Sequence, residues 1–133
     1  MQPQTILVAS ADPYRSKAMR DCLVNAGYQV NIRDSGLDVL RVIRQVKPIL
    51  AVLEWNLPEL SGLELTRMLR AGEQTSRIPI ILMGPGLSDE NRLLGYEAGA
   101  DICMTGSFTP KVFVARVHAL LRRANPYDLP VRY

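Results

Sequence analysis

Two continuous apolar runs constrain the fold of this chain more than any other feature. Ile49–Leu53 and Pro79–Met83 show no alternation of apolar and polar residues. Uninterrupted runs of this length are typical of strands whose two faces are both covered. Parallel sheets with helices on both sides bury their strands in this way. The two runs therefore predict an α/β protein.

Shorter segments with strand and helix patterns alternate with these runs. Ile6–Ala9, Tyr28–Ile32 and Ile102–Met104 are the other predicted strands. Predicted helices cover about 12–26, 37–46, 63–69, 88–98 and 110–123. This order predicts a doubly wound sheet of five parallel strands with helices on both faces. The functional site of such a sheet lies beyond the carboxyl ends of its strands, here in the loops after Ala9, Leu53, Met83 and Met104.

Composition restricts the class of protein. The chain has 133 residues, of which 47% are apolar and 22% charged, which fits one globular domain and excludes bulk disorder. Its net charge of +3 is too small to indicate nucleic-acid binding by itself. No run approaches the ~18 apolar residues of a membrane helix, and the first residues lack a signal-peptide pattern. Cys22 and Cys103 form no metal or redox motif, so we expect a cytoplasmic chain with reduced thiols and no membrane contact.

Several motifs in order carry a family resemblance. They are Ile6–Pro13, Pro48–Gly62, Ile78–Ile81, Gly95–Asp101 and Thr105–Pro110. From about residue 4 to residue 123 the chain resembles the receiver domain of bacterial two-component response regulators. The resemblance implies a flavodoxin-like fold with strand order 2-1-3-4-5.

The end of the chain resembles one branch of that family. Arg122 and Arg123, followed by a proline-containing segment up to Tyr133, are similar to the OmpR/PhoB branch, in which a winged-helix DNA-binding domain follows the receiver. We therefore expect a receiver over 1–123 and a linker over 124–133. That linker would lead toward a C-terminal DNA-binding domain that is not present in this chain and that would make the contact with DNA.

The resemblance also implies a phosphoryl-transfer site, and this sequence departs from it at most positions. In receivers an aspartate after the third strand accepts phosphate from a histidine kinase, and acids after the first strand hold Mg²⁺. A hydroxyl after the fourth strand and a lysine after the fifth bind the phosphoryl oxygens, and an aromatic residue in the fifth strand couples that event to the surface. The acids map to Ser10 and Ala11, with Asp12 one place later; the acceptor maps to Glu54, the hydroxyl to Gly84, the aromatic residue to Cys103, the lysine to Gly106 and the proline after it to Ser107.

These departures predict a receiver that is not phosphorylated, binds no metal or cofactor and has no catalytic residue. The carboxylate of Glu54 lies about one methylene further out than that of an aspartate, and misplacement on that scale can cost ~10²-fold in rate. Mg²⁺ tolerates a poor ligand set badly. Glu54 either imitates a phosphorylated aspartate or is a solvated loop acid, and we favour the second because Gly84 and Gly106 offer it no partner. A residual phosphoacceptor role for Glu54 or Asp12 is the further alternative.

Other residues near the site have structural interpretations beside functional ones. Asp12 precedes Pro13 at a helix start, which favours an N-cap over a remnant metal ligand. Cys103 is expected to be a small buried residue, although a sensor role is open. Trp55 is expected to be partly exposed, either as an anchor for a protein partner or packed over the site.

We expect the chain to form a homodimer through the fourth helix, the fifth strand and the fifth helix. That surface is the usual receiver dimer face in the resembled branch. Apolar residues at positions where charges are common favour association without phosphorylation. The alternative for these apolar residues is a place in the monomer core. The alternative for the whole chain is a stand-alone adaptor that docks a protein or a small ligand in the vacated pocket. The predicted face comprises Arg92, Leu94, Glu97, Asp101, Ile102, Val112 and Arg116.

Overall fold

A five-stranded parallel sheet in the order β2-β1-β3-β4-β5 forms the centre of the molecule, as the sequence predicts. The computed structural model describes residues 4–84, 86–105 and 109–124. Strands and helices alternate along the chain without exception in these ranges. The elements are β1 (Thr5–Ala9), α1 (Pro13–Asn25), β2 (Gln29–Arg33), α2 (Gly36–Val46), β3 (Leu50–Glu54), α3 (Gly62–Ala71), β4 (Ile80–Gly84), α4 (Asp89–Ala98), β5 (Ile102–Thr105) and α5 (Pro110–Ala124).

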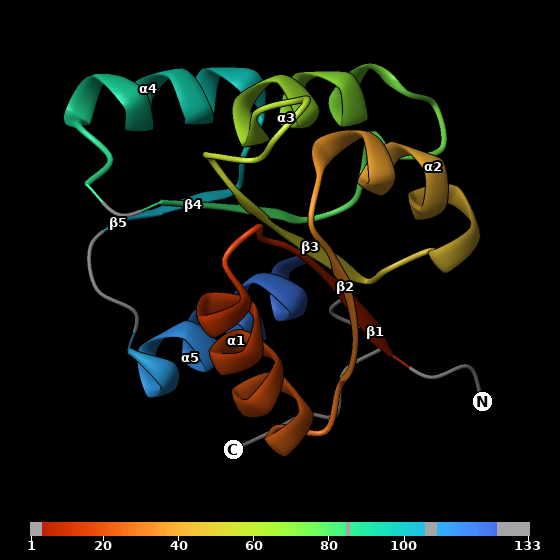
Figure 1. Ribbon diagram of the computed structural model, residues 1–133, viewed down its shortest axis with the longest axis vertical. Coiled ribbons are helices and arrows are strands. Elements are labelled where there is room, and N and C mark those ends of the chain that lie inside the picture. The colour runs from red at the N-terminus through yellow and green to blue at the C-terminus, as the bar shows by residue number, and fades with distance from the viewer. Residues whose placement is uncertain (1–3, 85, 106–108, 125–133) are drawn as a thin grey trace.

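Helices cover both faces of this sheet and enclose two apolar cores. Helices α1 and α5 lie on one face, and α2, α3 and α4 lie on the other (Figure 1). Along β3, Leu50 and Val52 point into the α1/α5 core, whereas Ala51 and Leu53 point into the opposite one. All four are fully buried. This double burial is the physical reason for the continuous apolar runs.

The central strands begin and end one residue later than the sequence pattern indicates. The β3 strand runs to Glu54 and pairs that residue with Met83 of β4. Pro79 precedes β4, and its carbonyl accepts a bond from the Ala51 N–H. A proline has no N–H of its own to donate to a ladder, which suits a position just before the strand. Glu54 is therefore the last residue of a strand and does not belong to a loop.

Helix termini follow the signals in the sequence. Asp12 is the N-cap of α1 and its carboxylate accepts bonds from the backbone N–H groups of Tyr14 and Arg15, which confirms the predicted cap. Gly27 follows α1 with a φ of +101°, a left-handed conformation that a glycine adopts without steric cost. The receiver boundary expected at residue 123 lies within α5, which runs to Ala124, and the rest of the predicted linker lies outside the described residues.

Within the part of the chain that the structure describes, no helix combines the length and apolar character needed to span a bilayer.

Candidate functional site

Ser10 and Glu54 lie side by side at the carboxyl edge of the sheet. The register pairs Ala9 of β1 with Leu53 of β3, so the residues that follow them are neighbours. Side chains alternate between the faces of a strand, and both residues follow the parity of Val8 and Val52, which point toward α1 and α5. The two side chains therefore meet beneath the start of α1.

The Glu54 carboxylate is buried and has two partners. Only 6% of the residue is exposed to solvent. Its Oε1 accepts a hydrogen bond of 2.9 Å from the Ser10 hydroxyl and forms an ion pair of 2.7 Å with Nε of Arg15. The expectation of a solvated loop acid is wrong, because Glu54 ends a covered strand and finds partners that do not come from Gly84 or Gly106.

Arg15 is the site residue that the sequence interpretation missed. It lies in the first turn of α1, whose entry is held by the Asp12 cap. That turn lies over the carboxyl ends of β1 and β3, so a cation three residues after the cap reaches Glu54. A basic residue at this position was visible in the sequence, but the resemblance assigns no role to it. The side chain is 22% exposed and its guanidinium faces the carboxylate.

The residues at this edge do not fit a magnesium ion. Mg²⁺ is held by carboxylates and other hard oxygen ligands in near-octahedral geometry. Ser10 and Ala11 carry no carboxylate, and the Asp12 carboxylate accepts bonds from its own helix. The guanidinium of Arg15 is bound to Oε1 of Glu54. Among the residues that the structure describes, no three His, Cys, Asp or Glu side chains form a group that could hold a metal.

The other positions of the resembled site lie on the opposite face of the sheet. A Cβ added to Gly84 would lie 3.2 Å from the Leu87 side chain and 3.3 Å from the Trp55 Cβ. Leu87 is buried, and Trp55 is half-buried against the core beneath α3 and α4, as expected for packing over the site. The Gly84 position is thus lined by apolar atoms. Gly106 and Ser107 lie outside the described residues.

Cys103 is buried in β5 beneath α4, as expected for a small apolar residue. Burial raises the pKa of its thiol, against a smaller opposing effect of the Arg92 charge. The thiol lies under Gly95 of α4, where an added Cβ would come within 2.6 Å of Sγ. The backbone N–H of Cys103 donates to the Tyr96 hydroxyl over 3.1 Å, which satisfies one donor on the outer edge of the sheet. Desolvation also raises the pKa of Cys22.

The residues of the predicted dimer face do not all lie together. Val112 is 45% exposed on α5 and Ile102 is half-buried against the α1/α5 core. Tyr96 reaches β5 from α4. Leu94 is two residues away from Tyr96, or about 200° around the helix, so it lies on the side of α4 away from β5. Arg92 pairs with Asp89 of its own helix, and Glu97 and Arg116 are exposed.

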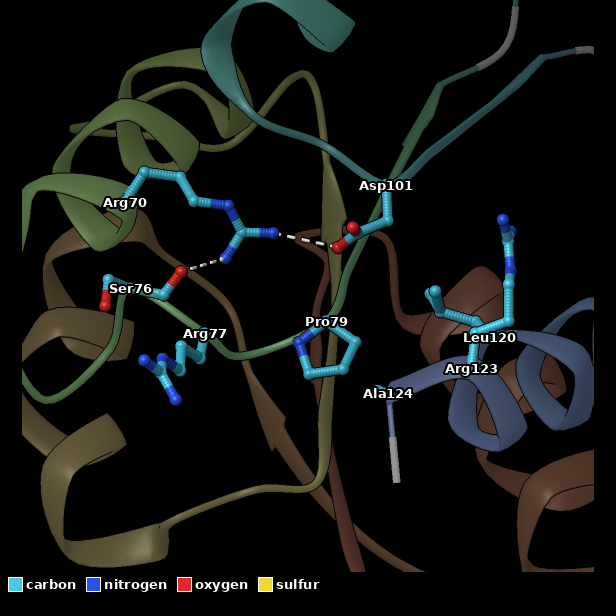
Figure 2. Close-up of a pocket in the computed structure, with 8 residues that line it drawn as sticks. All are labelled: Arg70, Ser76, Arg77, Pro79, Asp101, Leu120, Arg123 and Ala124. Carbon is cyan, nitrogen blue, oxygen red and sulfur yellow. Dashed lines mark hydrogen bonds and ion pairs between the residues drawn. The ribbon is translucent and has the colours of Figure 1, made fainter. Parts of the chain in front are cut away.

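Asp101 belongs to a different cluster at the amino edge of the sheet. Its carboxylate pairs with Arg70 of α3 over 2.8 Å (Figure 2). It also accepts a bond from the backbone N–H of Ile80. Arg70 also donates to the carbonyls of Gly99, Ser76 and Ile78. Asp101 is therefore engaged within the monomer.

Comparison with known proteins agrees with the fold and with the order of the motifs. The family model of the response regulator receiver domain matches residues 6–118. The phosphate regulon transcriptional regulatory protein PhoB of Pseudomonas aeruginosa is 37% identical over 96% of this chain and 56% of its own length. The DNA-binding response regulator MtrA of Mycolicibacterium smegmatis is 34% identical over 90% of this chain and 51% of its own. The chain spans about half the length of the curated relatives it matches.

Solved structures show the same architecture. The BeF3-activated N-terminal receiver domain of Klebsiella pneumoniae RstA superposes with a TM-score of 0.82 at 30% identity, covering 89% of this chain and 98% of that one. The receiver domain of Francisella response regulator 1452 superposes with a TM-score of 0.83 at 26% identity, covering 92% and 98%. With the family model matched over most of its length, this chain belongs to the response regulator receiver domain family, and its relatives are regulators of the OmpR/PhoB type.

Proposed function

We propose that this receiver works without phosphorylation and serves as a dimerisation module of a cytoplasmic transcription regulator. The observation that carries the proposal is the buried Glu54 carboxylate bound by Arg15 and Ser10. We infer from it that the acceptor position holds a permanent internal ion pair in place of a metal ion and a phosphoryl group.

The charges at the site support this proposal. A phosphoryl group adds about −1.5 to −2 charge and needs cations or N–H donors around it. The one cation bound here, Arg15, is already paired with Glu54. On the opposite face, Gly84 is surrounded by the apolar side chains of Leu87 and Trp55. A new phosphoryl group would therefore meet a paired carboxylate on one side and apolar atoms on the other.

Exposed apolar side chains along α4 and α5 support the dimerisation role. Leu93, Tyr96 and Val112 are 59%, 49% and 45% exposed. They lie on elements that flank β5, the last strand of the sheet. Edge strands leave backbone groups unpaired on one side, and a second copy that covers this edge would bury apolar area as well. Association through this face would be driven by apolar burial and would not require the charge of a phosphoryl group.

A phosphorylation assay tests the first half of the proposal. The protein is incubated with Mg²⁺ and a small acyl-phosphate donor, and its intact mass is measured. We expect no phosphorylated species, and also no change in Trp55 fluorescence when beryllofluoride and Mg²⁺ are added. A stable phosphorylated species on Glu54 or Asp12 would overturn the proposal.

A variant that restores acidic side chains provides the matched control. The triple change Ser10→Asp, Ala11→Asp and Glu54→Asp, combined with Arg15→Ala, removes the ion pair and returns three carboxylates to the carboxyl edge. We expect Mg²⁺ to change the Trp55 fluorescence of this variant and to leave that of the natural chain unchanged. An equal response of both proteins would show that the ion pair does not exclude the metal.

Light scattering coupled to size exclusion tests the second half. We expect a dimer whose population does not depend on Mg²⁺ or beryllofluoride. Val112→Glu should convert it to a monomer, whereas Val24→Glu, which changes a similarly exposed valine on α1, should not. A monomer at high micromolar concentration, or a dimer formed only with beryllofluoride, would refute the module.

A further inference from the structure

Two hollows lie at the amino edge of the sheet, at the end opposite Glu54. The first has a volume of about 430 Å³ and is lined by Arg77, Pro79 and Arg123 among others (Figure 2). The second has a volume of about 410 Å³ and is lined by Arg44 and Lys47, and by Gln74 and Ile78 of the loop that connects α3 to β4. The loop 72–79, which connects α3 to β4, forms the ridge between them. Arg70 and Asp101, which pair with each other, also line the first hollow, so four further cations lie along the two depressions.

This ridge is held in place by side-chain bonds to its backbone. Arg70 donates from Nη1 to the Ser76 and Ile78 carbonyls over 3.1 and 2.6 Å. Thr75 donates from its buried hydroxyl to the Leu69 carbonyl over 2.6 Å. Asp101 neutralises Arg70 and bonds the first residue of β4. A ligand would meet a surface whose shape is already formed, which lowers the ordering cost of binding.

The four cations on either side of the ridge are available to a partner. Arg44, Lys47, Arg77 and Arg123 are all exposed. Within the described part of the chain, the ion pairs involve other residues: Arg15, Lys17, Arg33, Arg70 and Arg92 hold the paired carboxylates. Arg44 and Arg123 lie in the last turns of α2 and α5, where a positive charge interacts favourably with the helix dipole. Arg77 lies in the loop, so the helix dipole does not explain its charge. The net charge of the whole chain, +3, does not reveal this local excess of positive charge, because acidic residues elsewhere offset it.

The arrangement of these cations favours an extended anion over a compact one. Arg77 and Arg123 lie on opposite sides of the first hollow and do not converge on one point (Figure 2). Arg44 and Lys47 lie across the ridge, in the second hollow. A single phosphate cannot contact cations that are separated in this way. A backbone that repeats a negative charge every few ångströms can.

The character of the surface favours a nucleic-acid backbone over an acidic protein. Protein interfaces are usually centred on buried aromatic or apolar anchors. None of the exposed large apolar side chains of the described residues, which are Tyr14, Val24, Leu37, Met68, Leu93, Leu94, Tyr96 and Val112, lines either hollow. Arginine is the side chain that matches phosphate geometry best. We propose that the surface formed by Arg44, Lys47, Arg77 and Arg123 binds the phosphate backbone of double-stranded DNA without reading its sequence.

This inference does not rest on the proposed function. The surface lies at the amino ends of the strands, whereas Glu54 lies at a carboxyl end. It would act whether or not the receiver is phosphorylated or dimeric. Its effect would be to hold the receiver against DNA beside any sequence-specific site.

Fluorescence anisotropy of a labelled duplex with a scrambled sequence tests the proposal on this chain. Four phosphate contacts predict a salt slope of about −3.6, or a loss of roughly 150-fold in affinity between 50 and 200 mM salt. The variant Arg44→Ala, Lys47→Ala, Arg77→Ala and Arg123→Ala should lose at least about tenfold in affinity at 50 mM salt, with a flatter slope. A matched variant, Arg20→Ala, Arg41→Ala, Arg67→Ala and Lys111→Ala, removes the same charge elsewhere and should retain most of the binding.

Further arms separate the other outcomes. Arg44→Lys, Arg77→Lys and Arg123→Lys keep the charge and should keep most of the affinity, and circular dichroism confirms that each variant is folded. Equal losses in the two alanine variants, or no binding at 50 mM salt, would overturn the proposal. Displacement of the duplex by polyglutamate of equal charge would assign the surface to acidic proteins. Displacement by inorganic phosphate at constant ionic strength would assign it to a small anion, and either result would overturn the DNA assignment.

Discussion

At the scale of single residues, the site is defined by the environment of one carboxylate. Glu54 ends a covered strand, and the parity of that strand directs its side chain toward α1. The removal of a charge from water has to be offset by partners, and Arg15 and Ser10 supply them. The structure thus places the Glu54 carboxylate in an internal ion pair.

Loss of Arg15 should destabilise the domain because it leaves a buried charge without its counter-ion. We expect Arg15→Ala to lower the free energy of unfolding by about 2–4 kcal/mol, toward the lower end for buried pairs because the guanidinium keeps some exposure. Urea unfolding measures the change. Arg20→Ala on the exposed face of the same helix should cost less than ~0.5 kcal/mol.

A double-mutant cycle isolates the pair itself. Glu54→Gln combined with Arg15→Ala should cost less than the sum of the two single changes, since the second substitution removes the charge left alone by the first. Additive costs would show that Arg15 contributes through packing and not through the carboxylate.

The two cysteines should be poor nucleophiles in the folded protein. Burial raises the pKa of both thiols, so the thiolate fraction at neutral pH is lower than for a free cysteine and rises only as the pH approaches the raised pKa. We expect Cys103 to react with a disulfide reagent only after unfolding, and Cys22, which is half-buried, to react first. In Cys22→Ser, a native protein that reacted at the rate of a free thiol would contradict this prediction.

At the scale of secondary-structure elements, α4 is seated on β5 through a glycine. Gly95 is the buried residue of this helix, and the Cys103 sulfur occupies the space where a Cβ would lie. The Tyr96 hydroxyl on the next residue bonds the β5 backbone. The close approach of α4 to β5 therefore depends on the absence of a side chain at Gly95 and on the small side chain of Cys103.

Gly95→Ala should be destabilising although alanine is the better helix former. The added methyl would overlap the Cys103 sulfur at 2.6 Å, and overpacking of this kind costs about 1–3 kcal/mol, more than the ~1 kcal/mol gained in helix propensity. Thermal unfolding of the variant measures the loss. Adding Cys103→Ala should recover most of the lost stability. If the double variant is no more stable than Gly95→Ala, the contact with the Cys103 sulfur is not the cause of the loss.

At the scale of the whole molecule, the amino edge of the sheet is tied together by one arginine. Arg70 joins α3, the loop before β4, the turn after α4 and Asp101 before β5. These segments lie up to 31 residues apart in the sequence. The same clamp shapes the two basic hollows, so the stability of this edge and its proposed DNA contact depend on common contacts.

Arg70→Ala should loosen this edge as a unit. Several backbone carbonyls would lose a charged donor, and we expect a loss of about 2–4 kcal/mol in the free energy of unfolding. Hydrogen exchange should rise in residues 72–79 and 99–101 and change little around Glu54. Arg67→Ala, an exposed arginine one turn earlier on α3, is the control. Uniform exchange changes across the sheet would refute a local clamp.

Local patterns in the sequence are enough to predict the fold class, the order of the elements and the cap at Asp12. Apolar runs such as Ile49–Leu53 report burial on two faces, and Asp12 before Pro13 specifies a cap from its own neighbours. The pattern places the ends of β2, β3, β4 and β5 one residue early. That small shift matters, because it separates a loop acid from the buried end of a strand at Glu54.

Which side chains meet depends on how the elements pack in three dimensions. The pairing of Arg15 with Glu54 joins residues 39 positions apart and depends on strand parity, register and the seat of α1, which no local pattern encodes. The separation of Leu94 from the β5 side of α4, and the gathering of basic residues from α2, the 72–79 loop and α5, have the same origin. Local chemistry selects the elements, whereas packing across the sheet selects the neighbours, and the charge of a site depends on its neighbours.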